Sequence, residues 1–323
     1  MTERILVTGG SGYLGSVLVG ELLGRGQAVR VLDSMLHADG SSSTAAHVSD
    51  RLEVIAADIR DRGALAAALA DVAAVVHLAA IVGDPACARE PEAAREVNLD
   101  ATVALLGAAE AAGVGRVVFA STCSNYGRIE SETLATEDFP LRPISLYAET
   151  KVAAETHVVD RGRPGFCTTC LRFATLYGSS PRMRFDLTVN EFTREVALGR
   201  ELVVYGETFW RPYVHVRDAA RAVAMTLDAP TSAVAGEVFN VGDTRENYRK
   251  EDIVGLLRQR FPDARVRYVA QADDPRNYRV SFEKVRARLG FSATRSVAEG
   301  IEEVAGSLLD GTIPDPDATV YRN

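Results

Sequence analysis

The chain has 323 residues, of which 47% are hydrophobic and 25% charged, so it can bury a large core in one domain or in two closely joined ones. Its formal net charge of -8 comes from residues spread along the whole chain without a basic block, which argues against a nucleic-acid partner. Met1 leads into an apolar stretch without a charged leader or a long apolar run, so we expect neither secretion nor membrane insertion but a cytoplasmic protein.

Short apolar runs rich in Val, Ile and Leu predict the strands of a parallel sheet. Most segments between them have helical character, and this alternation predicts an α/β fold with a doubly wound, Rossmann-type sheet. The predicted strands span residues 4–8, 28–32, 52–56, 73–78, 116–120 and 166–172.

A glycine-rich turn follows the first predicted strand and leads into a helix. It contains Gly9, Gly12 and Gly15, and Tyr13 and Leu14 lie between the last two glycines. Glycine lets the backbone approach a pyrophosphate, while the helix N-terminus supplies free N–H groups and the positive end of the helix dipole. Strand, turn and helix in this order therefore predict a dinucleotide site.

Acidic residues follow the second and third predicted strands. Asp33 lies eighteen residues beyond Gly15, where a carboxylate binds the adenosine ribose hydroxyls and repels a 2′-phosphate, so NAD is expected rather than NADP. Asp58 and Ile59 suit the adenine ring. The stretch from Leu36 to Asp50 has loop composition and is expected to be a mobile loop beside the cofactor.

Two polar motifs come later in the predicted domain. Residues 117–127 end a strand with Ser121 and Thr122, and Tyr147-Ala-Glu-Thr-Lys151 follows. A spacing of four places Tyr147 and Lys151 on one helix face, where the ammonium is expected to lower the pKa of the phenol from its usual value of about 10.

The pair Cys167 and Cys170 has the spacing of a redox or metal site. The pair lies in a predicted strand, where an odd separation sends the two thiols to opposite faces of the sheet. We therefore expect both cysteines to pack in the core, and we propose no metal site.

The pattern changes after about residue 178. A polar loop is followed by predicted helices near 186–198, 249–260 and 297–309 and by predicted strands near 202–205 and 237–241. We expect an NAD-binding domain over residues 1–178 and a smaller substrate-binding α/β lobe over residues 179–323, interleaved with the first.

Taken together, these motifs resemble the extended short-chain dehydrogenase/reductase family, and within it the nucleotide-sugar epimerases and dehydratases. The resemblance covers nearly the whole chain. It includes the glycine turn, Asp33, residues 58–59, residues 77–80, Asn98, Thr122, Tyr147, Lys151, residues 171–178 and residues 211–218.

The resemblance implies a role for several of these residues. Thr122 would bond the reacting sugar hydroxyl, Tyr147 would be the acid/base, and Lys151 would bind the nicotinamide ribose. Tyr147 would take a proton from the C4 hydroxyl as hydride leaves that carbon, and rotation of the keto-sugar before hydride return would invert the centre. The residues implied to line NAD are Leu78, Ala79, Ala80 and Asn98.

The resemblance also implies contacts to a nucleotide-diphosphate sugar. The guanidinium groups of Arg211 and Arg276 suit phosphate oxygens. Thr175 stands where many relatives carry an asparagine that touches the sugar phosphate. Ser124 and Asn190 are further candidates, and the arginines of the 180–190 loop suit an anionic or bulky sugar. His77 and His215 are expected to be structural.

The residues after Thr122 narrow the choice of reaction. Dehydratases and decarboxylases of this group carry a glutamate there, often after an aspartate. This chain has Cys123 and Ser124 instead, which disfavours a 4,6-dehydratase. We expect a 4-epimerase; the alternatives are a keto-sugar reductase and an NAD-binding regulator without turnover. The helices containing residues 90–112 and 145–161 commonly form a dimer interface in this family, so we expect a homodimer.

Overall fold

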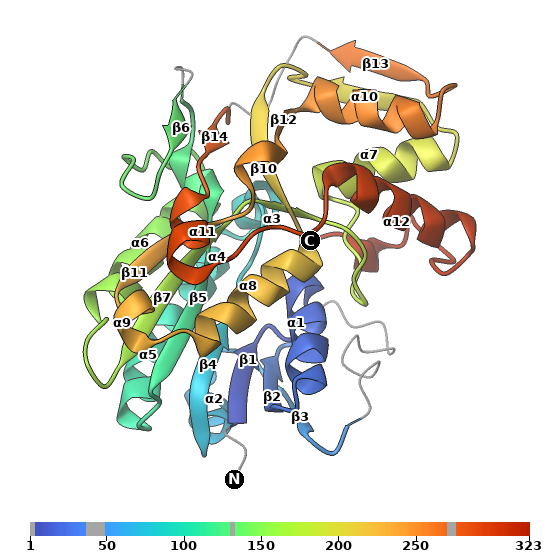
Figure 1. Ribbon diagram of the computed structural model, residues 1–323. Coiled ribbons are helices and arrows are strands. Elements are labelled where there is room, and N and C mark those ends of the chain that lie inside the picture. The colour runs from blue at the N-terminus through green and yellow to red at the C-terminus, as the bar shows by residue number, and fades with distance from the viewer. Residues whose placement is uncertain (1–3, 37–48, 130–132, 270–275) are drawn as a thin grey trace.

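The central feature of the computed structural model, which describes residues 4–36, 49–129, 133–269 and 276–323, is the predicted parallel sheet (Figure 1). In this part of the chain the sheet has seven strands in the order β11-β7-β5-β4-β1-β2-β3, all paired in parallel. Their bounds are β1 (Arg4–Thr8), β2 (Ala28–Asp33), β3 (Leu52–Ala56), β4 (Val72–His77), β5 (Arg116–Thr122), β7 (Cys167–Phe173) and β11 (Glu237–Val241).

Helices cover both faces of this sheet. One face packs on α1 and α8 through Leu18 and Val223, and the other packs on α2, α5 and α6 through Leu65, Leu105 and Val158. Each face is therefore the core of a three-layer structure, which explains why the strands are apolar on both sides. The helices that flank the sheet or follow its strands are α1 (Tyr13–Gly24), α2 (Arg62–Ala68), α3 (Asp84–Arg89), α4 (Pro91–Arg95), α5 (Ala101–Ala111), α6 (Leu146–Asp160), α8 (Val216–Asp228), α9 (Thr231–Val234) and α11 (Glu283–Leu289).

A second core lies above the carboxyl edge of the sheet and joins α7, α10 and α12, which Figure 1 shows gathered to one side. Phe192, Leu257 and Ile301 represent the three helices in this core. The elements outside the central sheet and its flanking helices are β6 (Leu134–Ala135), β8 (Thr175–Tyr177), α7 (Thr188–Ala197), β9 (Leu202–Tyr205), β10 (Trp210–His215), β12 (Asn247–Arg249), α10 (Lys250–Arg260), β13 (Val266–Val269), β14 (Arg279–Val280) and α12 (Val297–Leu309). Their strands form small sheets with the pairings β12-β10-β8, β13-β9 and β14-β6.

The chain returns to the central sheet after residue 178. Strand β11, which the sequence analysis attributed to the second lobe, pairs with β7 at the edge of the seven-stranded sheet. The expected loop at residues 36–50 falls largely on residues 37–48, which lie outside the described part of the chain.

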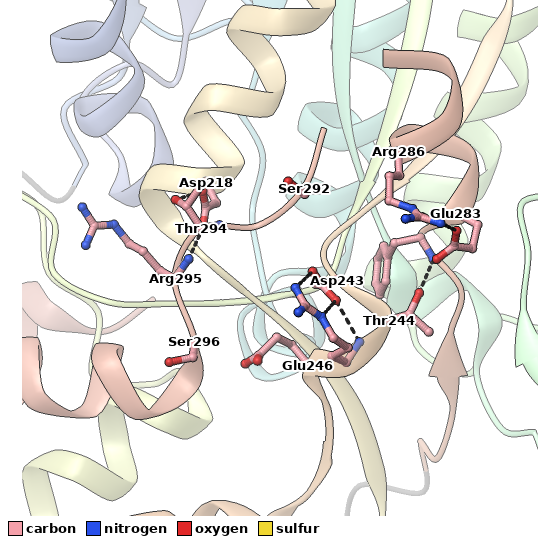
Figure 2. A network of polar contacts seen from close by, with 12 residues as sticks. Asp218, Asp243, Thr244, Glu246, Glu283, Arg286, Ser292, Thr294, Arg295 and Ser296 are labelled. Atoms are coloured by element: carbon pink, nitrogen blue, oxygen red, sulfur yellow. Dashed lines mark hydrogen bonds and ion pairs between the residues drawn. The ribbon is translucent and has the colours of Figure 1, made fainter. Parts of the chain in front are cut away.

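A polar network fixes the start of α12 beside α8 (Figure 2). The carboxylate of Asp218 accepts hydrogen bonds from the backbone amides of Thr294 and Arg295 at 2.9 and 3.0 Å, and Glu246 accepts one from Val297 at 2.9 Å. Because α8 also packs on α1, these bonds tie the start of α12 to the helices that cover one face of the central sheet.

The cysteines pack as the sequence predicts. Cys167 belongs to the core on one face of the sheet and Cys170 to the core on the other, and both are free and buried. Core packing of this pair is confirmed.

Candidate active site

A cavity of about 940 Å³ opens at the carboxyl ends of the central strands. Its wall includes the glycine turn after β1, Asp33 at the end of β2, the loops after β3 and β4, and Thr122 at the end of β5. In an open parallel sheet this edge is where ligands bind, and the volume suits a nucleotide cofactor with a small substrate.

The glycine turn brings the backbone to the floor of the cavity. Gly9 has φ +72°, and a Cβ placed on it would lie 2.7 Å from the amide nitrogen of Ala79. A Cβ on Gly15 would overlap the carbonyl oxygen of Gly9. No side chain caps α1 at Gly12, so the first turn of this helix presents its backbone amides at the cavity. This cradle fits an anionic pyrophosphate.

Asp33 is oriented by the backbone on both sides of the cavity rim. One carboxylate oxygen accepts a hydrogen bond from the amide of Ser11 and the other from the amide of Met35, both at 2.9 Å. Asp58 also lines the cavity, but it forms an ion pair with Arg60 at 2.7 Å, and hydrogen bonding to Arg60 lowers the pKa of its carboxyl. The turn and the fixed Asp33 carboxylate together fit the dinucleotide that the sequence predicts.

Helix α6 presents Tyr147 and Lys151 to the cavity beside Thr122. Ser145 caps this helix by accepting a hydrogen bond from the amide of Ala148, which fixes the first turn that carries Tyr147. The Nζ of Lys151 donates to the carbonyl oxygen of Ala120 at 2.9 Å and so ties the helix to β5. The three predicted catalytic residues therefore come from two packed elements and face one cavity.

The expected lowering of the Tyr147 pKa is not found in the protein alone. Burial raises the pKa of the Tyr147 phenol well above its usual value, against an opposing effect from Arg184. Burial also lowers the pKa of Lys151 to about 8. The spacing of the two residues does not reveal the cost of burying both side chains, and here that cost determines the direction of both pKa shifts.

The predicted substrate residues Ser124, Thr175, Arg211 and Arg276 line the same cavity. Arg276 forms an ion pair with Asp84 at 3.2 Å and donates a hydrogen bond to the hydroxyl of Ser124 at 3.3 Å. Arg211 donates to the backbone carbonyl of Arg276 and lies over the ring of Tyr278. These arginines thus form one linked group, which the distance between them in the sequence does not reveal.

Two predicted residues lie behind the cavity wall. The Asn98 amide bonds both the backbone amide and the carbonyl of Ile81, and it therefore supports the loop after β4. Asn190 is completely buried; its amide bonds the backbone of Gly178 and Arg184 and the hydroxyl of Tyr13. The structure thus corrects the interpretation of Asn190 as a substrate contact, because its hydrogen-bonding groups hold the chain together.

Some residues on the cavity wall were not predicted from the sequence. Asp84 at the start of α3 and residues 320–323 at the C-terminal end both line it. Arg182 and Arg184, from the loop expected to contact the sugar, line it as well. Nothing in the composition of residues 320–323 indicates a site; only the folded chain brings them there.

Both histidines singled out in the sequence make structural contacts. His77 is buried between the hydroxyls of Thr8 and Thr102 at 2.7 and 2.9 Å, and burial lowers its pKa to about 3. His215 caps α8, and its Nε2 lies 2.6 Å from a carboxylate oxygen of Glu303. Among the described residues, no group of three His, Cys, Asp or Glu could hold a metal ion. Within those same residues, every helix is too short or too polar to cross a membrane.

Comparison with known proteins identifies relatives that all belong to one enzyme family. The NAD dependent epimerase/dehydratase family matches residues 5–242. A UDP-glucose 4-epimerase of Mycolicibacterium smegmatis is 31% identical over 92% of this chain and 96% of its own length. A dTDP-glucose 4,6-dehydratase from Streptomyces venezuelae, solved with NAD, is 30% identical, covers 96% of this chain and 98% of its own, and superposes with a TM-score of 0.85.

A second solved structure gives the same result. The UDP-glucose 4-epimerase of Thermus thermophilus, in complex with NAD, is 28% identical, with 94% of this chain and 98% of that chain covered and a TM-score of 0.82. Epimerases and dehydratases thus match about equally well, and both were solved with NAD. The chain belongs to the NAD dependent epimerase/dehydratase family, within the extended short-chain dehydrogenase/reductases, and its cofactor is NAD.

Proposed function

We propose that this enzyme is an NAD-dependent epimerase of nucleotide-diphosphate sugars, which inverts C4 through a transient keto-sugar. The observation that carries the proposal is the chemistry of the two residues after Thr122. Cys123 is buried, its thiol donates to the carbonyl oxygen of Arg172, and burial raises its pKa far above the usual value. The hydroxyl of Ser124 accepts a hydrogen bond from Arg276. Neither side chain supplies the acid that a dehydratase needs for elimination.

The remaining groups suit a reversible oxidation at one sugar carbon. In the described part of the chain no hydrogen-bond partner meets the Tyr147 hydroxyl, which lines the cavity and is thus available to a sugar hydroxyl. The Oγ1 of Thr122 accepts a bond from the amide of Ser124 at 3.1 Å, so its own proton is left for a sugar oxygen. NAD, when bound, would supply a reversible acceptor for the hydride of the sugar carbon. Tyr147 removes and returns the hydroxyl proton, and Thr122 orients the sugar.

The linked arginines support a diphosphate on the substrate. Arg211 and Arg276 lie on the cavity wall, and a guanidinium group offers paired donors to phosphate oxygens. In the protein alone, Arg276 forms an ion pair with Asp84 at 3.2 Å. We propose that the substrate diphosphate displaces this carboxylate from Arg276.

The proposal is tested by incubating the purified enzyme with a panel of nucleotide sugars and no added NAD, with products followed by NMR. An epimerase yields the C4 epimer until equilibrium is reached. Accumulation of a 4-keto-6-deoxy sugar would identify a dehydratase, and turnover only with added NADH or NADPH would identify a reductase. A protein that holds NAD but converts none of these sugars would favour the alternative of an NAD-binding regulator without turnover.

The role of Tyr147 is tested by Tyr147→Phe. The variant is expected to retain NAD and to lose at least about a hundredfold in turnover, because the acid/base is removed while the ring stays. Tyr205→Phe is the matched control, since Tyr205 is 47% exposed on β9. Unchanged turnover in Tyr147→Phe would exclude the proposed role.

A further inference from the structure

Arg182 is a buried cation on the wall of the NAD cavity. Its exposed fraction is 6%, and it lies on the loop that follows β8. Two residues earlier, the Ser180 hydroxyl donates to the carbonyl oxygen of Tyr13 at 2.7 Å. The loop is therefore anchored to the first turn of α1, the helix end that fits the pyrophosphate.

Among the described residues the Arg182 guanidinium makes no direct ion pair, and the carboxylates of Asp186 and Asp33 act on it only from beyond ion-pair distance. Its Nη2 donates to the backbone oxygen of Arg322 at 3.1 Å and to the amide oxygen of Asn323 at 2.8 Å, both of them neutral acceptors. Its Nε is buried and meets no hydrogen-bond partner in the part of the chain that the structure describes. Within the described residues, no carboxylate lies in ion-pair distance of this guanidinium. Arg184, by contrast, bonds both carboxylate oxygens of Asp186.

A buried charge of this kind is costly unless a counter-charge meets it. Burial, together with the neighbouring Arg184, lowers the pKa of Arg182 to about 10, so the group remains a cation at neutral pH. Arg182 and the glycine turn line the same cavity, and the turn is where the two negative charges of the NAD pyrophosphate would bind.

We propose that Arg182 supplies the counter-charge of the NAD pyrophosphate opposite the glycine turn, and that residues 322 and 323 hold its guanidinium in place. The turn contributes backbone amides and the end of a helix dipole, and Arg182 adds a full charge with a free donor. The inference rests on the NAD site of the proposed function, but it is independent of which sugar reaction the enzyme performs.

Residues 321–323 join two rims of the cavity. The amide of Phe185 donates to the carbonyl oxygen of Tyr321 at 2.8 Å, and the two rings meet edge to face. On the other side, the Asn323 amide reaches the carbonyl oxygen of Val82, in the loop after β4, at 3.5 Å. Figure 1 shows the C-terminal end in the middle of the view rather than at the periphery. The segment thus fixes the arginine loop across the cofactor cavity.

The test compares three ligands on protein freed of NAD, using calorimetric titrations of NAD, ADP and adenosine. In Arg182→Gln, the dissociation constants of NAD and ADP are expected to rise roughly 10- to 100-fold, the range for losing a charged hydrogen bond. Adenosine has no pyrophosphate, so its constant is expected to change by less than about twofold. Asn323→Ala is expected to weaken NAD and ADP by a smaller factor, because the guanidinium loses one support.

Arg258→Gln is the control for net charge, since Arg258 is exposed on α10 and lies outside the cavity. Equal losses for adenosine and ADP, or an unchanged ADP constant, would overturn the proposal. If Arg182→Gln does not fold, as judged by circular dichroism, the same three titrations on Asn323→Ala decide by the same criterion. No turnover is measured, so failure here leaves the epimerase proposal standing, and failure to epimerise leaves this inference standing.

Discussion

At the scale of a single residue, Lys151 must carry a positive charge at a position that is buried from water. Its Nζ is held against the carbonyl oxygen of Ala120 and lies 4.6 Å from the centre of the Phe119 ring. The side chain is 2% exposed, and burial lowers its pKa to about 8. The residue that the family resemblance assigns to the nicotinamide ribose is therefore one that carries a poorly solvated charge in the NAD-free protein.

This conflict predicts a pH-dependent gain in stability for Lys151→Met in NAD-free protein. A lysine pKa of about 8 in the folded chain and 10.5 in the unfolded chain means that the unfolded chain binds more protons between these values, so stability rises with pH across this window. Below pH 8 the variant is expected to be the more stable by at most about 3 kcal/mol, and its advantage should shrink toward pH 10.5. Urea unfolding at pH 7, 9 and 10.5 measures this. A difference independent of pH, or equal to that of the control Lys284→Met, would contradict it.

Single residues could be predicted where a local spacing determines them. Tyr147 and Lys151 share a helix, and Asp33 ends a strand, so short stretches of sequence were sufficient to place them. The pKa of Tyr147 could not be predicted, because Arg184 and the covering residues come from distant parts of the chain. Asn190 was misjudged for the same reason: its partner Tyr13 lies 177 residues away.

At the scale of elements, a glycine-to-alanine substitution is expected to have opposite effects on stability at the two ends of α1, because only the first turn of this helix packs tightly against the glycine turn. In Gly15→Ala the new Cβ would meet backbone atoms of Gly9 and Gly10, which cannot rotate away. We expect a loss of about 1–3 kcal/mol in unfolding free energy, typical of overpacking, with weaker NAD binding because the cradle must open.

Gly24→Ala is the matched control on the same helix, because no atom of the described residues lies within 4 Å of a Cβ there. It is expected to raise stability by up to about 1 kcal/mol through helix propensity, without effect on NAD. Chemical denaturation and NAD titration measure both variants. A Gly15→Ala protein that binds NAD normally would show that the turn is not the pyrophosphate cradle.

Elements with a strong period, an apolar run or an alanine-rich stretch such as α2 and α5 were predicted, and several short strands were not. The helices α7, α10 and α12 agree with expectation within two residues at each end. Strands β8, β10 and β12 were missed because each gains its stability from pairing with the others rather than from its own few residues. Helix α8 was also missed. The sheet that carries Arg211 therefore could not be located in advance.

At the scale of the whole molecule, the sequence indicates contacts between successive elements but not contacts between distant segments. The order of the first strands and their covering helices follows from right-handed crossovers in a parallel sheet. The return of β11 to the edge of that sheet, beside β7, is a contact between segments about 70 residues apart and has no local pattern. The same holds for residues 320–323, which reach the cofactor cavity from the end of the chain.

The expected homodimer is a prediction about the outer face formed by α5 and α6. Ala104, Gly107 and Ala108 are partly exposed on α5, and within the described ranges no atom lies within 4 Å of a Cβ added to Gly107. Small residues let two helices approach closely, so Gly107→Glu should disrupt a dimer packed on this face while the monomer fold stays intact.

Analytical ultracentrifugation at micromolar concentration measures the oligomeric state of each protein. The control is Gly255→Glu on α10. This helix position is equally open to a Cβ, but it lies on a helix of the second core, away from α5 and α6. A dimer in the wild type and in Gly255→Glu, with a monomer in Gly107→Glu, would place the interface on α5. A monomeric wild type, or a Gly107→Glu dimer of unchanged strength, would contradict this interface.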